Sequence, residues 1–170
     1  YTDATTTGLV NCKTKQFDID LIQTLGLPLQ MFPSLNMPGT VVGKLNDNVA
    51  KEVGGQTPVK LCPSHDTASA FYAVDNPVDS LLISSGTWAI LGAKIKEANV
   101  SRDALRYNFA NEGGVGNFRF LKNITGMWIN VCLKNVFGRS FDEMTHLASE
   151  STFDGIFDVN AKEFSLPENM

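Results

Sequence analysis

The hydrophobic pattern of the first half of the chain predicts short helices that alternate with short strands. Apolar residues recur at helical spacing from Phe17 to Leu25, with acids early in the segment, and Gly26 then ends the pattern. The Thr-rich segment 1–11 is expected to be a loop or the start of a helix. The further expected elements are a strand over 40–45, a helix over 46–53, a strand over 58–62 and a helix over 67–73.

From Ser80 onward the pattern predicts strands first and helices afterwards, an order typical of the opening of an α/β domain. The expected strands are 81–85 and 88–96, joined by a Gly86-Thr87 hairpin turn, and 107–111 and 117–120, which flank a glycine-rich turn over 112–116. One helical face is expected to contain Leu121, Ile124, Trp128, Val131, Cys132 and Val136. Gly138 would end that helix, and Ser140 with Glu143 would form the capping box of a second one, which runs to about Ser149.

The composition indicates an ordinary globular protein and argues against two classes of partner. Of its 170 residues, 43% are hydrophobic and 19% are charged, and the net charge of −4 disfavours nucleic acid and anionic membranes. No apolar run is long enough to span a bilayer. The cysteines Cys12, Cys62 and Cys132 are odd in number and form no CxxC motif, which argues against a structural zinc site. They favour a reducing, cytoplasmic location. Cys62 and Cys132 lie in apolar runs and are expected to be buried.

Two polar steps that follow apolar runs are the candidates for chemistry. A His-Asp-Thr step occupies positions 65–67, and a Ser-Ser-Gly-Thr step occupies positions 84–87. The carboxylate of Asp66 is a possible proton acceptor, and the turn at Thr87 is a possible phosphate cradle. An ordinary helix cap remains the alternative, because the side chains at positions 64, 66 and 67 can all accept hydrogen bonds from first-turn N–H groups.

The glycine-rich segment 112–116 carries neither of the two common phosphate-binding motifs. Arg119 interrupts a G-x-G-x-x-G pattern, and no Gly-Lys-Ser/Thr follows the glycines. The sequence therefore gives no support for a dinucleotide fingerprint or a P-loop.

Six motifs, spread in order from Ala4 to Trp128, resemble those of the FGGY carbohydrate kinases. They are Ala-Thr-Thr-Thr-x-Leu-Val-Asn at 4–11, Pro-Gly-Thr-Val-Val-Gly at 38–43, His-Asp-Thr-Ala-Ser-Ala at 65–70, Leu-Ile-Ser-Ser-Gly-Thr-Trp at 82–88, Asn-Glu-Gly-Gly at 111–114 and Phe-Leu-Lys-Asn-Ile-x-Gly-x-Trp at 120–128. Residues beyond about Gly138 add little to the resemblance.

The resemblance implies an α/β fold of the actin-like, ribonuclease H-like sugar kinase type, of which this chain holds only the central part. Residues 1–76 would form the C-terminal part of the first, sugar-binding domain, and residues 77–170 the N-terminal part of the second, nucleotide-binding domain. The family's Asp-x-Gly-Thr motif and its glycine-rich adenosine loop do not occur in the sequence. The chain is therefore expected to be a piece of a longer one, and the Mg²⁺ ligands and adenine contacts are expected outside it.

The resemblance also implies roles for individual residues. Asp66 would be the catalytic base, and the sugar would be bound by His65, Asp66, Thr67 and Asn123. Gly86 and Thr87 would meet the phosphates of ATP, and no metal ligand is expected in this chain. Without the resemblance, a cap in a first helical turn is the preferred explanation of Asn123. Val131 stands where relatives often carry a polar residue that contacts the nucleotide, which leaves that contact open.

The function implied by the resemblance is ATP- and Mg²⁺-dependent phosphorylation of the terminal hydroxyl of a deoxy-ketohexulose. L-Rhamnulose, giving L-rhamnulose 1-phosphate, is the leading substrate, and L-fuculose or another pentulose or hexulose is the alternative. A non-catalytic sugar-binding protein on the same fold is the rival from another class. The expected partners are the sugar, ATP and the rest of the same kinase chain, without nucleic acid or membrane, and the isolated chain is expected to be inactive.

Overall fold

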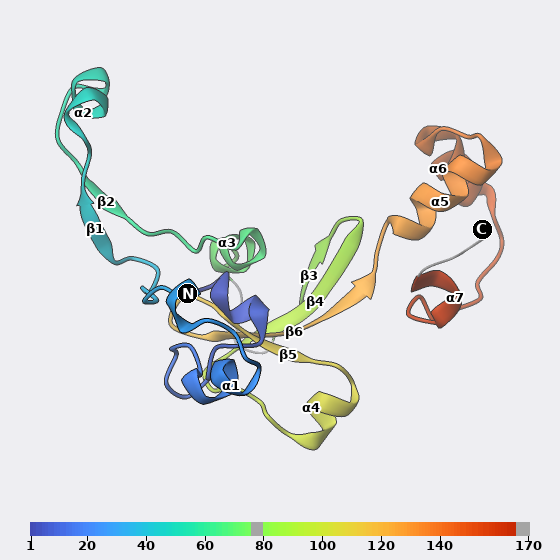
Figure 1. Ribbon diagram of the computed structural model, residues 1–170. Coiled ribbons are helices and arrows are strands. Elements are labelled where there is room, and N and C mark those ends of the chain that lie inside the picture. The colour runs from blue at the N-terminus through green and yellow to red at the C-terminus, as the bar shows by residue number, and fades with distance from the viewer. Residues whose placement is uncertain (76–79, 166–170) are drawn as a thin grey trace. The chain divides into compact units, whose positions relative to one another are not determined.

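A computed structural model describes residues 1–75 and 80–165 of this mixed α/β chain (Figure 1). Contacts divide the chain into two compact units. The first unit comprises Tyr1–Ser80 and Gly92–Leu121, and the second comprises Leu81–Leu91 and Lys122–Met170. The domain boundary expected between residues 76 and 77 lies outside the described residues.

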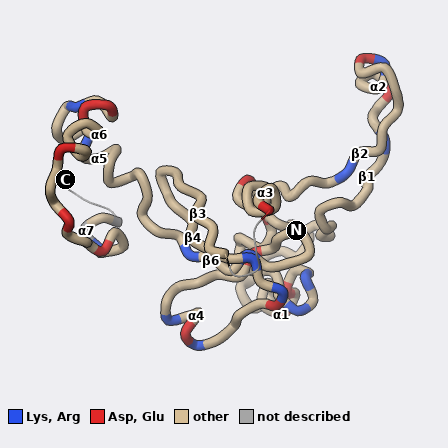
Figure 2. The backbone as a smooth tube through the Cα atoms, turned by 180° about the vertical axis from the view of Figure 1, so that it is seen from behind, with Lys and Arg blue, Asp and Glu red and all other residues tan. Residues whose placement is uncertain are grey.

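The first unit begins with short helices and a two-stranded hairpin. Its elements are η1 (Ala4–Thr7), α1 (Ile19–Thr24), η2 (Leu29–Met31), β1 (Val41–Lys44), α2 (Asp47–Val53), β2 (Pro58–Lys60), α3 (Asp66–Ala73) and α4 (Arg102–Arg106). β1 and β2 pair antiparallel, with Val41 opposite Lys60. Helices α2 and α4 each place an acid in the first turn and a base in the last turn, which complements the helix dipole (Figure 2).

A four-stranded sheet of order β3-β4-β6-β5 carries the later part of the chain. Its strands are β3 (Leu82–Ser85), β4 (Trp88–Ile95), β5 (Ala110–Gly113) and β6 (Phe118–Thr125). Both long strands, β4 and β6, contain residues of both units. In the first unit, a Cβ on Gly92 would lie 2.7 Å from Cβ of Leu121, so β4 approaches β6 closely enough to require a glycine there.

The core of the first unit lies between its helices and its part of the sheet. Ala68 and Phe71 of α3 and Leu121 of β6 are buried, and so is Ile22 of α1. Phe109 and Phe120 stack with ring centroids 4.7 Å apart. Ala68 and Phe71 of α3 line a small cavity with Lys94 and Arg119, so the buried face of α3 is turned toward the first unit's strands.

The second unit contains the β3–β4 hairpin, the end of β6 and three helices. The helices are α5 (Trp128–Phe137), α6 (Phe141–Glu150) and α7 (Lys162–Ser165). Gly138 ends α5 in the left-handed region at φ 59°. Ser140 then begins α6 with a capping box: its Oγ accepts from Glu143 N at 3.2 Å, and Glu143 Oε2 accepts from Ser140 N at 2.7 Å.

The predictions that rest on strong local signals are confirmed. Helix α1 starts at an Asp18 cap, and α2 is capped by Asn46 and ended by Gly54. The hairpin turn at Gly86-Thr87, the end of α5 at Gly138 and the capping box of α6 also occur where they are expected. Each of these features is decided by residues adjacent in the sequence.

The helix expected from Leu121 onward is wrong over its first part. Residues 118–125 form strand β6, whose first residues pair with β5, and α5 begins only at Trp128. Pairing with β5 satisfies the backbone at Leu121. Glu112 and Gly113 belong to β5 and not to the turn, and α4 occupies a segment for which no helix was expected.

The burial expected for two cysteines is not found. Cys62 is exposed, as are all three residues of β2 just before it, so the apolar run over 58–62 is not a core strand. Cys132, on α5, is half-buried. In the described part of the chain, no helix has both the length and the apolar character needed to cross a membrane.

We expect Ser140→Ala to weaken α6 locally, because the capping box loses the oxygen that accepts from Glu143 N. Loss of such a cap costs about 1 kcal/mol of local stability. Amide hydrogen exchange of residues 141–150 in the intact protein measures the effect. Ser149→Ala, which removes only a bond to the helix's own His146 carbonyl, is the matched control. Equal exchange in the two variants would contradict the cap.

Candidate active site

The His-Asp-Thr step lies at the N-terminus of α3, in the first unit. His65 is the N-cap residue but makes no side-chain cap bond, and Asp66 is the first helical residue. One carboxylate oxygen of Asp66, Oδ1, accepts from Thr67 N at 2.6 Å and from Thr67 Oγ1 at 3.1 Å. The Asp66 side chain is 97% exposed, whereas Thr67 is buried. The Asp66 carboxylate is therefore held by Thr67 through one oxygen, while Oδ2 has no partner among the described residues.

The surroundings of Asp66 keep its carboxylate ionised. The backbone N–H of Thr67, the Thr67 hydroxyl and the neighbouring His65 all lower the pKa of Asp66, and Arg119 adds a weaker contribution. Nδ1 of His65 lies 3.4 Å from Oδ1 of Asp66. The helix N-terminus supplies positive potential in the same direction. An ionised carboxylate at this place can accept a proton from a hydroxyl that is brought to it.

The cap explanation of this step is correct only for Asp66, which accepts a first-turn N–H. Ser64 instead contacts the hydroxyl of Thr2 at 3.3 Å, and the Thr67 hydroxyl points back to Asp66. Thr2 is buried, and its hydroxyl also accepts from His65 N at 3.2 Å. Sequence reasoning missed Thr2, whose only signal is its place beside the Thr-rich motif that begins at Ala4.

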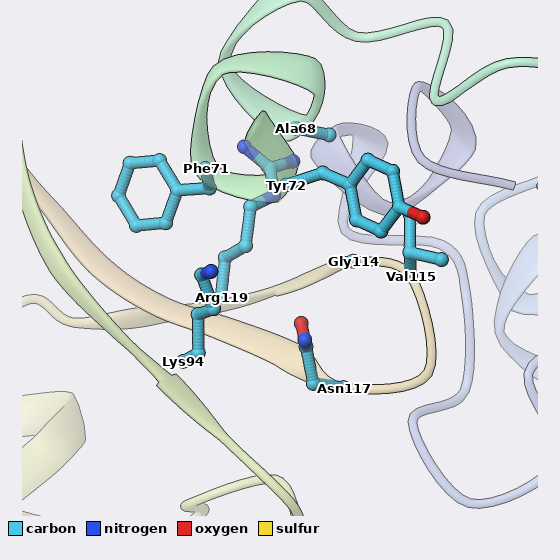
Figure 3. A pocket seen from close by; sticks show the side chains of 8 residues that line it. All are labelled: Ala68, Phe71, Tyr72, Lys94, Gly114, Val115, Asn117 and Arg119. Atoms are coloured by element: carbon cyan, nitrogen blue, oxygen red, sulfur yellow. The ribbon is translucent and has the colours of Figure 1, made fainter. Parts of the chain in front are cut away.

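Two hollows adjoin this step within the first unit. A cavity of about 260 Å³ opens beside Ser64 and is also lined by Tyr1, Ser34, Leu35, Asn36, Pro38, Leu61 and Cys62. A much smaller one, about 10 Å³, lies beneath α3 and is lined by the residues shown in Figure 3. The larger cavity has the mixed polar and apolar lining that suits a small polar ligand.

The turn at Gly86 and Thr87 is fixed by its own carbonyl groups, in the second unit. The carbonyl of Gly86 accepts from Met127 N at 2.9 Å, and that of Thr87 accepts from Trp128 N at 3.0 Å. Both turn residues are exposed, and the Thr87 hydroxyl has no partner among the described residues. Because its carbonyls face the start of α5, the turn is left with N–H and O–H donors that can meet an anion.

Gly126 makes this arrangement possible, although sequence reasoning assigned it no role. A Cβ at position 126 would collide with the carbonyl of Gly86 and would lie 2.8 Å from Ala89 N. The chain at the end of β6 can therefore contact the turn only when position 126 has no side chain.

The other predicted site residue, Asn123, is an exposed residue of β6 in the second unit. Because it lies in a strand, its alternative role as a helix cap is excluded. Val131 lies on α5 and is half-buried. The structure thus brings His65, Asp66 and Thr67 together in one unit and places Gly86, Thr87 and Asn123 in the other. Among the described residues, no three His, Cys, Asp or Glu side chains gather as a metal site requires.

Comparison with protein families and curated proteins relates this chain to sugar kinases. Residues 1–72 match the N-terminal domain of the FGGY family of carbohydrate kinases. The rhamnulokinase of Oceanobacillus iheyensis is 42% identical over 173 residues, covering 100% of this chain and 37% of that protein. The rhamnulokinase of Enterococcus faecalis is 38% identical over 99% of this chain and 35% of that protein. The chain thus spans somewhat over a third of the length of these curated relatives.

Solved structures show the same fold. The ligand-bound xylulose kinase from Lactobacillus acidophilus superposes on 87% of this chain and 31% of that one, with a TM-score of 0.68 at 16% identity. The gluconate kinase from the same organism covers 75% of this chain and 26% of its own, with a TM-score of 0.56 at 19% identity. These likenesses confirm the predicted α/β sugar kinase fold, of which the chain contains a part.

We expect Gly126→Ala to displace the Gly86-Thr87 turn, because the added methyl group would overlap the Gly86 carbonyl. Overpacking of this kind costs about 1–3 kcal/mol. Faster amide exchange at Met127 and Trp128, whose N–H groups bond the turn, would report the change in the intact protein. Gly55→Ala, at a glycine with open space around it and no positive φ, is the control. Unchanged exchange at both amides would show that the turn does not need Gly126.

Proposed function

We propose that the protein is an ATP-dependent sugar kinase to which this chain contributes the catalytic base and a phosphate-binding turn, since residues 1–72 match the N-terminal domain of the FGGY family of carbohydrate kinases. The observation that carries the proposal is the exposed, ionised carboxylate of Asp66, held at the N-terminus of α3 by Thr67. A purely sugar-binding protein has no need of such a base. The retention of Asp66 together with the Gly86-Thr87 turn therefore favours a kinase.

In the proposed reaction, Asp66 acts on the terminal hydroxyl of a ketose. The hydroxyl oxygen forms a bond to the γ-phosphorus of ATP, the bond from that phosphorus to the β–γ bridging oxygen breaks, and ADP leaves. The hydroxyl proton passes to Oδ2 of Asp66, the oxygen that Thr67 does not engage. Phosphoryl transfer needs alignment and charge stabilisation more than covalent help, and a fixed carboxylate supplies the alignment.

The remaining residues are assigned to binding. We place His65, Thr67 and Asn123 on the sugar, and the donors of Gly86 and Thr87 on the ATP phosphates. Helix α3 and the turn lie in separate units, although the first unit also includes Gly92–Leu121. We assign residues 1–76 to a sugar-binding part and residues 77–170 to a nucleotide-binding part. Mg²⁺, when bound, would neutralise phosphate charge, and we assign its ligands and the adenine contacts to segments outside this chain.

L-Rhamnulose is the proposed substrate, with L-rhamnulose 1-phosphate as the product. The identity to rhamnulokinases along the whole chain supports this choice. L-Fuculose or another pentulose or hexulose is the second candidate, because we assign the residues that select the sugar to parts of the first domain outside this chain. The unpaired thiols of Cys12, Cys62 and Cys132 are compatible with a reducing cytoplasm, where we place the reaction.

We expect Asp66→Asn in the full-length protein to lower kcat by at least ~10²-fold, because the amide keeps the shape but loses the basicity. The KM for the sugar should change little. Since the surroundings lower the pKa of Asp66 below its ordinary value of 3.8, the loss of wild-type rate caused by protonation of this group should have its midpoint below pH 3.8. Asp20→Asn, at an exposed first-turn aspartate of α1, is the matched control. A kcat within a few-fold of wild type would show that Asp66 is not the base and serves only as a helix cap.

Replacement of Thr87 tests the nucleotide side of the proposal. Thr87→Val removes one donor to a charged oxygen, a loss of ~1.5–3 kcal/mol. That loss should appear in kcat/KM for ATP and leave sugar binding intact, as measured by steady-state kinetics and sugar titration. Thr57→Val, at an exposed threonine with no side-chain bond among the described residues, is the control. Equal ATP kinetics in the two variants would make the turn a plain hairpin.

A further inference from the structure

Arg119 is a fully buried charge that the proposed function does not yet use. It lies on β6 in the first unit, has 0% exposure, and extends toward α3 (Figure 3). There it lines a cavity of about 10 Å³ together with Ala68, Phe71 and Tyr72 of α3. Its guanidinium therefore lies beneath the helix whose first residue is Asp66.

The hairpin of β5 and β6 accounts for only part of this guanidinium. Nη2 lies 2.8 Å from Oε2 of Glu112, the residue directly opposite on β5, and Nε donates to the Gly113 carbonyl at 3.1 Å. Nη1 has no hydrogen-bond partner among the described residues, and the contact between Nη2 and Oε2 of Glu112 is an ion pair without hydrogen-bond geometry. A buried ion pair contributes little net stability compared with an apolar pair of the same volume, so stability alone gives no reason for a charge here.

A second cation holds the other end of the same helix. Nζ of Lys94, on β4, donates to the carbonyl of Val74 at 2.5 Å, and Val74 is the C-cap residue of α3. Lys94 also lines the cavity beneath the helix. The adjacent strands β4 and β6 thus each contribute a cation that lies against α3. Lys94 contacts the last carbonyl of the helix, and Arg119 lies against its buried face.

The charges around Arg119 link it to the candidate base. Burial lowers the pKa of Arg119, whereas Glu112, Asp66 and Asp3 raise it, so the group keeps its charge. The attraction is mutual, because Arg119 also contributes to the lowered pKa of Asp66. The Arg119 charge therefore acts on Asp66 from inside the first unit, while the sugar would approach the exposed carboxylate from solvent.

We propose that Arg119 is a positioning residue for Asp66: paired with Glu112 on the sheet, it anchors α3 from below and so fixes the carboxylate at the helix N-terminus. This inference rests on the proposed kinase function. Arg119 touches neither sugar nor nucleotide in this scheme and acts only through α3. A misplacement of about 1 Å at a reacting group is enough to cost ~10²-fold in rate, so an anchor of this kind is a requirement for catalysis.

The decisive variant in the full-length protein is Glu112→Gln combined with Arg119→Met. Removing both charges together leaves no unpaired ion in the interior, so the thermal midpoint should stay close to that of wild type, whereas Arg119→Met alone strands Glu112 and should lower it. We expect kcat of the double variant to fall at least ~10-fold with the KM for sugar and ATP little changed. Arg119→Lys, which keeps the charge, should recover part of the rate. Arg102→Met, at an exposed arginine of α4, is the control.

A second comparison separates positioning from a general loss of structure. On the Asp66→Asn background, removal of the Glu112–Arg119 pair should cause little further loss of kcat, because effects that act through one group are not additive. The proposal would be overturned if the Glu112→Gln/Arg119→Met variant had wild-type kcat. It would also be overturned if removing the pair lowered kcat as much on the Asp66→Asn background as it does in wild type.

Amide exchange keeps the test independent of the kinase assignment. In the charge-pair variant, the amides of residues 67–73 should exchange at least ~10-fold faster than in wild type, with those of the β5–β6 hairpin unchanged. If wild type phosphorylates no ketose, or Asp66→Asn is silent, the proposed function fails. Faster exchange confined to α3 would still support the anchor, and unchanged exchange in α3 would refute it.

Discussion

A guanidinium with no access to solvent constrains the first unit more than any other single group. Arg119 cannot lose its proton at physiological pH, so its surroundings must supply acceptors, and Glu112 and the Gly113 carbonyl do so from the opposite strand. This requirement sets the register of β5 against β6, because a shift by one residue would move Arg119 to the other face of the sheet. Helix α3 then packs Ala68 and Phe71 over the side chain. The position of Asp66 follows from that packing.

In the second unit the corresponding constraint is a close approach of backbone to backbone. The carbonyls of Gly86 and Thr87 accept from the first amides of α5, which leaves the turn's own donors exposed. Gly126 permits this contact because it has no side chain to place between the two segments. The candidate residues of the two units are therefore held in different ways. In the first unit a buried charge pair packs against α3, and in the second unit Gly126 allows close backbone contact with the Gly86-Thr87 turn.

The parts of the fold that the sequence predicts are those decided by neighbouring residues. The Ser140–Glu143 capping box, the helix end at Gly138 and the β3–β4 hairpin all depend on local backbone chemistry. The second half of β6 was predicted as helix because Leu121 and Ile124 continue the helical spacing of Trp128, Val131 and Cys132. Pairing with β5, a contact across a turn, decides between the two. Cys62 was wrongly expected to be buried for a related reason, since an apolar run does not show whether another element covers it.

The same distinction applies to the candidate site. The His-Asp-Thr step and the Gly86-Thr87 turn can be found in the sequence, because each is a short motif after an apolar run. Their roles as base and phosphate cradle remain predictions. Thr2 could not be found in this way, since it reaches His65 from 63 residues away and leaves no pattern of its own.

The sequence contains a signal for the long-range role of Arg119, but only part of that signal was interpreted. In the sequence it was noted only as the residue that breaks a glycine fingerprint. A cation within the apolar run Phe118–Leu121, with Glu112 on the other side of a glycine-rich turn, is better explained as a cross-strand pair whose strands must be buried. A buried charge is costly and adds little stability once paired, so its presence under a helix that begins with an exposed carboxylate calls for an explanation beyond folding. The proposed role of Arg119 in placing the Asp66 carboxylate would provide that explanation.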